Sequence, residues 1–231
     1  MANNLVDIVK GIVSNIDLNL PVISITAGET IFLCSTLHIT VGVTIEDENN
    51  NQYLVTELVD NVSIKVSPLG ASPAAFIGTI VVAPVITVLH GSPASTNNEY
   101  LDIEQVSRDK TPFIWLLESY EYEQLPLDSS VVAKYQARLF FMDLTSEELW
   151  INDQHNDLAI KPMENLQIAF KEVIDNDYSF KRMTSYRVRV RPRFGVEVTN
   201  QGSDDKIINE DLSGVEVNMT IELFDLSICN C

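Results

Sequence analysis

The amino-acid sequence predicts an α+β protein, in which a mixed or antiparallel sheet with flanking helices is interrupted by a small all-β barrel or sandwich. Three observations support this prediction. Residues 3–17 show a helical pattern, residues 20–95 are rich in Val, Ile and Thr, and long alternating strands close the chain. We therefore expect residues 1–19 and 96–231 to form one α+β domain, with residues 20–95 inserted as a β-rich domain.

The first helix is predicted from the spacing of its apolar residues. Steps of three and four residues place these side chains on one helical face. They are Leu5, Ile8, Val9, Ile12, Val13 and Ile16. Asn3 or Asn4 suits the capping position, whereas Gly11 weakens the helix by up to about 1 kcal/mol relative to alanine. Packing against the rest of the protein must therefore hold this helix in place.

The β-rich segment is predicted to contain four or five strands, because β-branched residues alternate there with turn-forming sequences. The turns are expected at residues 47–51, 60–61 and 68–73. The acidic stretch DENNN at 47–51 resembles the start of a calcium-binding loop. It lacks the required Gly, and Leu58 stands where the final Glu belongs, so a hairpin turn is the better interpretation.

The rest of the chain combines strands with a helical section. Strands are predicted at 111–122 and 131–143, and Thr145 followed by Glu148 indicates a helix start. Pro162 suits the first turn of a further helix. Its apolar face is expected to contain Met163, Leu166, Ala169, Phe170 and Val173. The last two strands are predicted at 186–199 and 214–224.

The charge balance restricts the function. The chain has 33 acidic and 15 basic residues, a formal net charge of −18. This excess of negative charge argues against a protein that wraps nucleic acid, because neutralising phosphates needs a broad basic surface. No apolar run approaches the ~20 residues that span a bilayer, so we expect no membrane partner.

The sequence offers little catalytic chemistry. It contains no Gly-rich phosphate loop, no G-x-S-x-G and no H-E-x-x-H. His155, in NDQHND, is the best catalytic candidate, but its potential partners all belong to one polar loop, and a solvated loop is the favoured interpretation. His38 fits a satisfied core or surface position, and His90 a structural turn. We expect no enzyme activity, no cofactor and no metal.

The most unusual pattern is the segment YRVRVRPRFGVEV at residues 186–198. Six of the basic residues of this acidic chain fall between positions 181 and 193: Lys181, Arg182, Arg187, Arg189, Arg191 and Arg193. In a strand, the last four of these share one face, and Val188, Val190 and Phe194 share the other face and belong to the core. Pro192 indicates an edge strand or a bulge.

Three interpretations of this segment remain open. The arginines can pair with Glu216 and Glu222 of the last strand, which are expected to face outward, with Glu197 as a further partner. They can contact an acidic surface of another protein, including a second copy in a head-to-tail ring. They can also contact DNA phosphates. We therefore take the six cations, with Glu216 and Glu222, as candidate subunit-interface residues.

A family resemblance adds to these inferences. The stretches NNEYLDIEQVSRDKTPFIWLLE, TSEELWINDQHND, KPMENLQIAFKEVI and GVEVNMTIELFD resemble the tail-completion (tail-terminator) and neck-ring proteins of tailed bacteriophages, in the style of crAss-like phages of gut Bacteroidales. The resemblance covers residues 1–18 and about 100–231, in a helix–strand–strand–helix–strand–strand order. The β-rich segment is not part of the simple tail-terminator pattern.

The resemblance implies a structural virion protein, made in the bacterial host cytoplasm. It implies a closed homo-oligomeric ring, sixfold or twelvefold, between portal and tail. Its partners would be portal, neighbouring ring and tail proteins, and phage DNA would pass through the lumen without sequence-specific binding. The alternative function is a monomeric β-rich module that binds carbohydrate or protein. This module predicts a ligand-sized pocket, preferably with exposed aromatic residues. The β-rich segment is poor in aromatic residues, and Tyr53 and Phe76 stand out.

Overall fold

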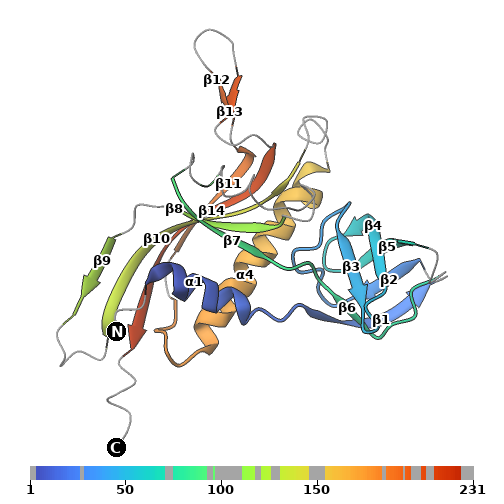
Figure 1. The fold of residues 1–231 in the computed structure, drawn as a ribbon, viewed down its shortest axis with the longest axis horizontal. Helices are drawn as coiled ribbons and strands as arrows, with labels where there is room; N and C mark the ends of the chain where they lie inside the picture. The colour runs from blue at the N-terminus through green and yellow to red at the C-terminus, as the bar shows by residue number, and fades with distance from the viewer. Residues whose placement is uncertain are drawn as a thin grey trace, which may run out of the picture.

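The structure is a computed structural model, and it combines a closed barrel with a larger mixed sheet that carries two α-helices (Figure 1). It describes residues 4–26, 29–70, 75–92, 96, 111–117, 121–125, 131–145, 154–183, 186–194, 196–198, 204–206 and 211–224. Within these ranges the protein is an α+β fold made mostly of strands, which confirms the predicted class at this level.

The β-rich segment forms a six-stranded antiparallel barrel, not a sandwich. Its strands are β1 (Asn19–Thr26), β2 (Thr30–Leu33), β3 (Thr44–Asp47), β4 (Gln52–Val59), β5 (Ser63–Pro68) and β6 (Ile80–Val82), in the closed order β1-β2-β5-β4-β3-β6. Because the barrel is closed, none of its strands has a free sheet edge that could pair with another strand.

The acidic stretch between β3 and β4 is a hairpin turn, as predicted. Asp47 is buried, and its Oδ1 accepts hydrogen bonds from the backbone N–H groups of Asn49 and Asn51 at 2.8 and 2.9 Å. Its Oδ2 accepts one from the Asn51 side chain at 2.8 Å. Burial alone would raise the pKa of Asp47, but these hydrogen bonds outweigh it and lower that pKa.

The larger sheet has the strand order β11-β14-β10-β8-β7, and β9 extends the β8 side of β10. All its pairs are antiparallel except β7 with β8. The strands are β7 (Thr87–Gly91), β8 (Phe113–Leu117), β9 (Glu121–Gln124), β10 (Val131–Leu144), β11 (Tyr186–Phe194) and β14 (Leu212–Phe224). A two-stranded ribbon of β12 (Val196–Val198) and β13 (Asp204–Lys206) projects from one end (Figure 1).

Two details of this sheet differ from the sequence-based expectation. Residues 87–91 were expected within the β-rich insert, but they form β7 and pair with β8, so the barrel ends at Val82. The single strand expected at 111–122 is divided into β8 and β9, which pair with different parts of β10. Both differences depend on which distant strand each segment pairs with. The local alternation of apolar and polar residues carries no information about that partner.

The helices agree with the predicted patterns. Helix α1 spans Leu5–Ser14, and the Asn4 side chain caps it by accepting a hydrogen bond from the N–H of Val6 at 3.2 Å. Helix α4 spans Lys161–Asn176, with Pro162 in its first turn, and the π-helical turn η2 (Asn156–Ile160) precedes it. Ala169 and Val173 are only partly buried; Gln167 and Ile174 complete the buried face. The helix expected after Thr145 falls largely outside the described residues.

Both helices pack on one face of the large sheet, in a core that continues into the barrel. Phe141 of β10 meets Phe170 of α4 edge-to-face, with ring centroids 5.6 Å apart. The opposite face carries a smaller apolar cluster, in which Trp115 stacks on Phe140 at 4.7 Å. The sheet therefore has apolar clusters on both faces, and one of them is shared with the barrel.

The barrel is attached to the rest of the molecule by buried polar contacts as well as by the core. Asn165 of α4 donates a hydrogen bond to Asp60 in the β4–β5 turn at 2.7 Å. Thr40 donates to Asp143 of β10 at 2.6 Å, with both side chains buried. His38 is fully buried beside them, and its Nε2 lies 2.7 Å from the carbonyl oxygen of Pro84.

Gly214 of β14 is the position where the sheet tolerates no side chain. A Cβ there would overlap the backbone carbonyl of Phe141, whereas a Cβ on Gly11 of α1 would meet nothing within 4 Å. We expect Gly214→Ala to lower the free energy of unfolding by about 1–3 kcal/mol or more through overpacking. The control Gly11→Ala should raise it by roughly 0.5–1 kcal/mol, because alanine is the better helix former. Urea denaturation followed by tryptophan fluorescence measures both; equal effects would contradict the strand packing described.

His38 should make stability pH-dependent. Burial is the main cause that lowers its pKa from 6.5 to about 4, despite the Pro84 carbonyl and the charge of Asp143. Between pH 6.5 and about 4, His38 is therefore protonated in the unfolded chain and neutral in the folded chain. The free energy of unfolding falls as the pH drops through this window, by up to about 3 kcal/mol. His38→Gln, which keeps a donor for Pro84, should flatten the unfolding free energy across this window. An unchanged pH dependence would contradict the assignment.

Candidate protein–protein interface

The arginine-rich segment forms β11, the strand at one edge of the large sheet. Among the described strands, β11 pairs only with β14, and the register continues upstream through a bridge between Phe180 and Leu223. The side chains of Val188 and Val190 are 37% and 48% exposed, so the prediction that they belong to the core is wrong. Their partners on β14 are buried. An edge strand has a neighbour on only one side, so its apolar side chains receive less cover than those of β14.

A bulge changes the direction of the side chains at the end of β11. Arg187, Arg189 and Arg191 pair with alternate residues of β14, but the register then jumps from Arg191 to Phe194. Because the β14 partners of Arg191 and Phe194 are two residues apart, Arg191 and Phe194 share a face. Phe194 contacts Phe140 on that face, with ring centroids 5.1 Å apart. Pro192 thus marks both an edge strand and a bulge.

This bulge corrects two sequence-based expectations. Arg193 does not continue the row formed by Arg187, Arg189 and Arg191, and Phe194 is not on the face of Val188. The additional residue at the bulge reverses the alternation on which both expectations rested. Arg193 instead lies close enough to His155 for its charge to affect that imidazole.

Glu216 lies on the same face of the sheet as Arg187, Arg189 and Arg191, and it binds Arg191. It was expected to face outward, but its side chain is only 1% exposed, between Arg138 of β10 and Arg191 of β11. Arg138 Nε and Arg191 Nε each donate to the carboxylate at 2.8 Å, and Asn218 Nδ2 donates at 3.2 Å. Burial alone would raise the pKa of Glu216, but these hydrogen bonds outweigh it and keep that pKa below its usual value.

The other candidate cations differ in how well they are neutralised. Lys181 forms an ion pair with Glu222 at 2.9 Å, and Arg182 lies 4.0 Å from Asp175. Arg187 and Arg189 are exposed, and no carboxylate within the described part of the chain lies in ion-pair distance of them. We call these two residues on the outer strand β11 the arginine edge.

Glu197 lies on a different strand from the arginines of β11. It was expected to be a further partner of the arginines along the last strand. The structure places it in β12, where it pairs with Asp205 of β13 in the separate ribbon. The strand predicted at 186–199 is thus two strands with different partners, β11 and β12. Among the described residues, the contact between an acid of β14 and a cation of β11 is that of Glu216 with Arg191.

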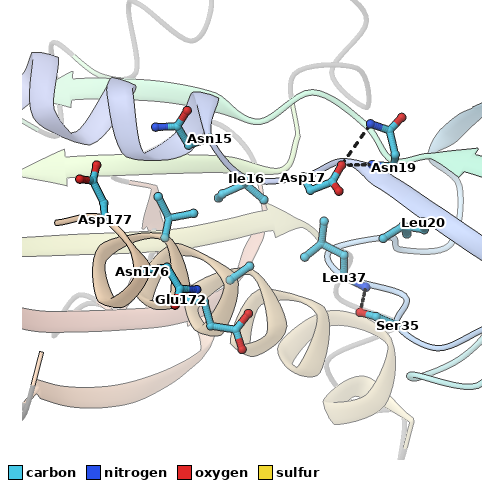
Figure 2. A pocket seen from close by; sticks show the side chains of 12 residues that line it. Asn15, Ile16, Asp17, Asn19, Leu20, Ser35, Leu37, Glu172, Asn176 and Asp177 are labelled. Atoms are coloured by element: carbon cyan, nitrogen blue, oxygen red, sulfur yellow. Dashed lines mark hydrogen bonds between the residues drawn. The ribbon is translucent and has the colours of Figure 1, made fainter. Parts of the chain in front are cut away.

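A groove of about 550 Å³ lies on the helix side of the molecule, at the seam with the barrel (Figure 2). Figure 2 shows the chain after α1 above it, the end of α4 below it and the barrel loop of Ser35 and Leu37 beside it. Its lining residues are Asn15, Ile16, Asp17, Asn19, Leu20, Ser35, Leu37, Ala169, Glu172, Val173, Asn176 and Asp177. We call it the acidic groove, because its described lining residues supply three carboxylates and no Lys or Arg.

Sequence reasoning missed this groove. Its lining comes from three segments that are far apart along the chain, and each segment looks ordinary by itself. Acidic residues are common throughout this protein, so their presence in any one segment gives no signal. Only the docking of the barrel loop against α1 and α4 brings the three segments together.

His155 occupies a structural position. It was expected in a solvated loop, but it is buried, and its Nε2 lies 3.0 Å from Ser213 Oγ. The Ser213 hydroxyl donates to the carbonyl of Pro192 at 2.7 Å, so Nε2 must carry the proton in the contact with Ser213. Burial first, and the charge of Arg193 second, lower the pKa of His155. The pair therefore ties η2 to the bulge, and the buried hydroxyl is not arranged as a nucleophile.

The described residues contain no group of three or more His, Cys, Asp or Glu side chains arranged to hold a metal ion. In the same part of the chain, no helix has both the length and the apolar character required to cross a bilayer. No family model, curated protein or solved structure matches this chain.

The Glu216 contacts predict a clear difference between two acids of β14. Glu216→Gln removes the charge between two guanidinium groups, and we expect a loss of about 1–3 kcal/mol in unfolding free energy. Glu222→Gln breaks a much more exposed pair and should cost no more than about 1 kcal/mol. Parallel urea denaturation of both variants measures this. Equal losses of unfolding free energy would mean that the buried contacts of Glu216 stabilise the sheet no more than the Lys181–Glu222 pair does.

Proposed function

We propose that this protein is a structural virion subunit of a tailed phage, which forms a homo-oligomeric ring in the portal–tail region and joins head to tail. The phage role follows the sequence resemblance, and the observation that carries the assembly part of the proposal is the arginine edge: two exposed arginines on the outer strand of a sheet, with no ion pair in the described part of a chain of net charge −18. Such a strip is complementary to the acidic remainder of another copy. A contact between two different surfaces generates rings when its rotation closes.

The edge strand supports an assembly function in a second way. An exposed edge exposes unpaired backbone groups to neighbours, and folded proteins usually protect such edges. Here the arginines disfavour pairing between two identical β11 strands, because like charges would then face each other. They leave the edge available to an acidic partner. This selectivity suits a subunit that must join its neighbours in one orientation.

The overall charge is consistent with a DNA channel. In the proposed ring, the phage DNA passes through the lumen without sequence-specific binding, and an acidic lumen lets it slide without adhering. The partners above and below are portal, neighbouring ring and tail proteins, and the protein is non-catalytic and needs no cofactor. The proposed symmetry is sixfold or twelvefold.

The alternative of a monomeric carbohydrate- or protein-binding module has less support. It predicts a ligand-sized pocket on the barrel, preferably with exposed aromatic residues. Tyr53 and Phe76, the two candidates, are buried and contact each other edge-to-face at 5.0 Å. A hollow of about 440 Å³ lies beside the barrel, between Val43 and Thr111, and the described residues that line it include no aromatic side chain. No observation on the described barrel favours a ligand over the arginine edge.

The proposal is tested by changing the arginine edge alone. We expect Arg187→Glu with Arg189→Gln to prevent assembly and to leave the monomer folded. Glutamine is chosen at position 189 because a carboxylate there would face Glu216 across the strands. Arg191 is left unchanged, because reversing its charge would break the contact with Glu216. Sedimentation velocity and negative-stain imaging measure assembly, and circular dichroism measures folding.

A matched control is available on other surfaces. Lys10 of α1 is exposed, and Lys65 of β5 forms an exposed pair with Glu57. Lys10→Glu with Lys65→Gln changes the net charge by the same amount, so it should assemble like the wild-type chain. Assembly of the edge variant at wild-type levels would rule out the arginine edge as the interface.

A further inference from the structure

We infer that the acidic groove receives the arginine edge of a second copy of this chain, so that the copies join head-to-tail. This inference rests on the proposed ring and identifies the second of its two contact surfaces. Two features support it: the chemistry of the groove and the placement of the two surfaces within one molecule.

The groove has the chemistry that a guanidinium group requires. Ile16, Leu20 and Leu37 give it an apolar floor, and Asp17, Glu172 and Asp177 supply the carboxylates. An arginine side chain covers apolar surface with its stem and the flat face of its guanidinium, while its N–H groups bind carboxylates in a forked geometry. A lysine would satisfy the charge but would use the apolar floor less well.

The carboxylates of the groove retain acceptors for an incoming donor. Oδ1 of Asp17 accepts hydrogen bonds from Asn19, and Oδ1 of Asp177 accepts one from the N–H of Ser179 at 2.8 Å. In the described part of the chain, no donor contacts their Oδ2 atoms or the carboxylate of Glu172. The groove therefore holds negative charge that its described side chains do not neutralise, since none of the described residues that line it is basic.

The arginine edge cannot reach the groove of its own molecule. The groove is lined by Ala169 and Val173 of α4, which packs on the face of the sheet that carries Phe141. In the strand register, Arg189 lies opposite Glu216, and Glu216 lies opposite Phe140. The side chains of these three residues share one face of the sheet, so the arginines point to the face opposite α4. Charge complementarity between these two surfaces is therefore available only between copies.

Two different surfaces on one chain define a heterologous contact. Each copy donates its arginine edge to one neighbour and its groove to the other, which builds a ring when the geometry closes. The contact would also engage the barrel, because Leu20 and Leu37 belong to the barrel side of the seam. The barrel would then help to form the ring contact in addition to any role on its exterior.

Two complementary variants test the inference. The edge variant is Arg187→Glu with Arg189→Gln, as above. The groove variant is Asp17→Asn, Glu172→Lys and Asn176→Lys: asparagine keeps the Oδ1 acceptor for Asn19, and both lysine positions are exposed on the last turns of α4. Lysine near a helix C-terminus is also compatible with the helix dipole. Circular dichroism confirms that each variant is folded.

We expect neither variant to assemble alone under conditions where the wild-type chain does. An equal mixture should recover assembly, because the reversed edge of one variant now complements the reversed groove of the other. Native mass spectrometry with one variant labelled with ¹⁵N should then show the two chains in equal numbers in every closed species. Such alternation is expected of a head-to-tail contact between these two surfaces.

The contrary outcomes are distinguishable. If the edge variant fails to assemble but the groove variant assembles like the wild type, the ring proposal stands and the groove is not its second surface. If both variants fail alone and their mixture also fails, the arginine edge does not meet this groove. If the wild-type chain itself stays monomeric at every concentration and ionic strength, the contact between copies is rejected with the ring.

Discussion

The contact of Glu216 with Arg138 and Arg191 is the constraint on which the interface depends. A carboxylate buried at the centre of the sheet would be costly without both guanidinium groups, so it holds β11 against β14 in one register. Arg191 is thereby used inside the molecule. Arg187 and Arg189, on the same face and free of such partners in the described chain, remain for contacts with other molecules. Glu216 thus divides the arginines of this face into one with an internal contact, Arg191, and two that are available to other molecules, Arg187 and Arg189.

The barrel and the large sheet share one core, and this connection determines the shape of the helix side. Asn165 and Asp60 join α4 to the β4–β5 turn, and Thr40 and Asp143 join the barrel to β10. Because the barrel is held against α4 and β10, its loop completes the acidic groove. The β-rich segment is not part of the simple tail-terminator pattern. In this structure it nevertheless forms part of the surface that we propose as the ring contact.

Several elements were predictable from the sequence because their signals are local. The apolar spacing of α1 and α4, the alternation of β10 and β14 and the DENNN turn each need only neighbouring residues. The failures are non-local. Residues 87–91 join a parallel pair with β8, the bulge at Pro192 reverses the faces of Arg193 and Phe194, and the burial of Glu216 depends on Arg138, 78 residues away. The groove depends on three distant segments and had no sequence signal.

The most direct test of the account is native mass spectrometry of the unmodified chain at low and at high ionic strength. The account predicts a closed species with one fixed copy number at low ionic strength. It also predicts dissociation toward monomer as salt shortens the Debye length from about 10 Å at 0.1 M to about 3 Å at 1 M. A chain that is monomeric under all conditions, or an assembly that salt does not affect, would contradict the claim that charge on β11 joins the copies.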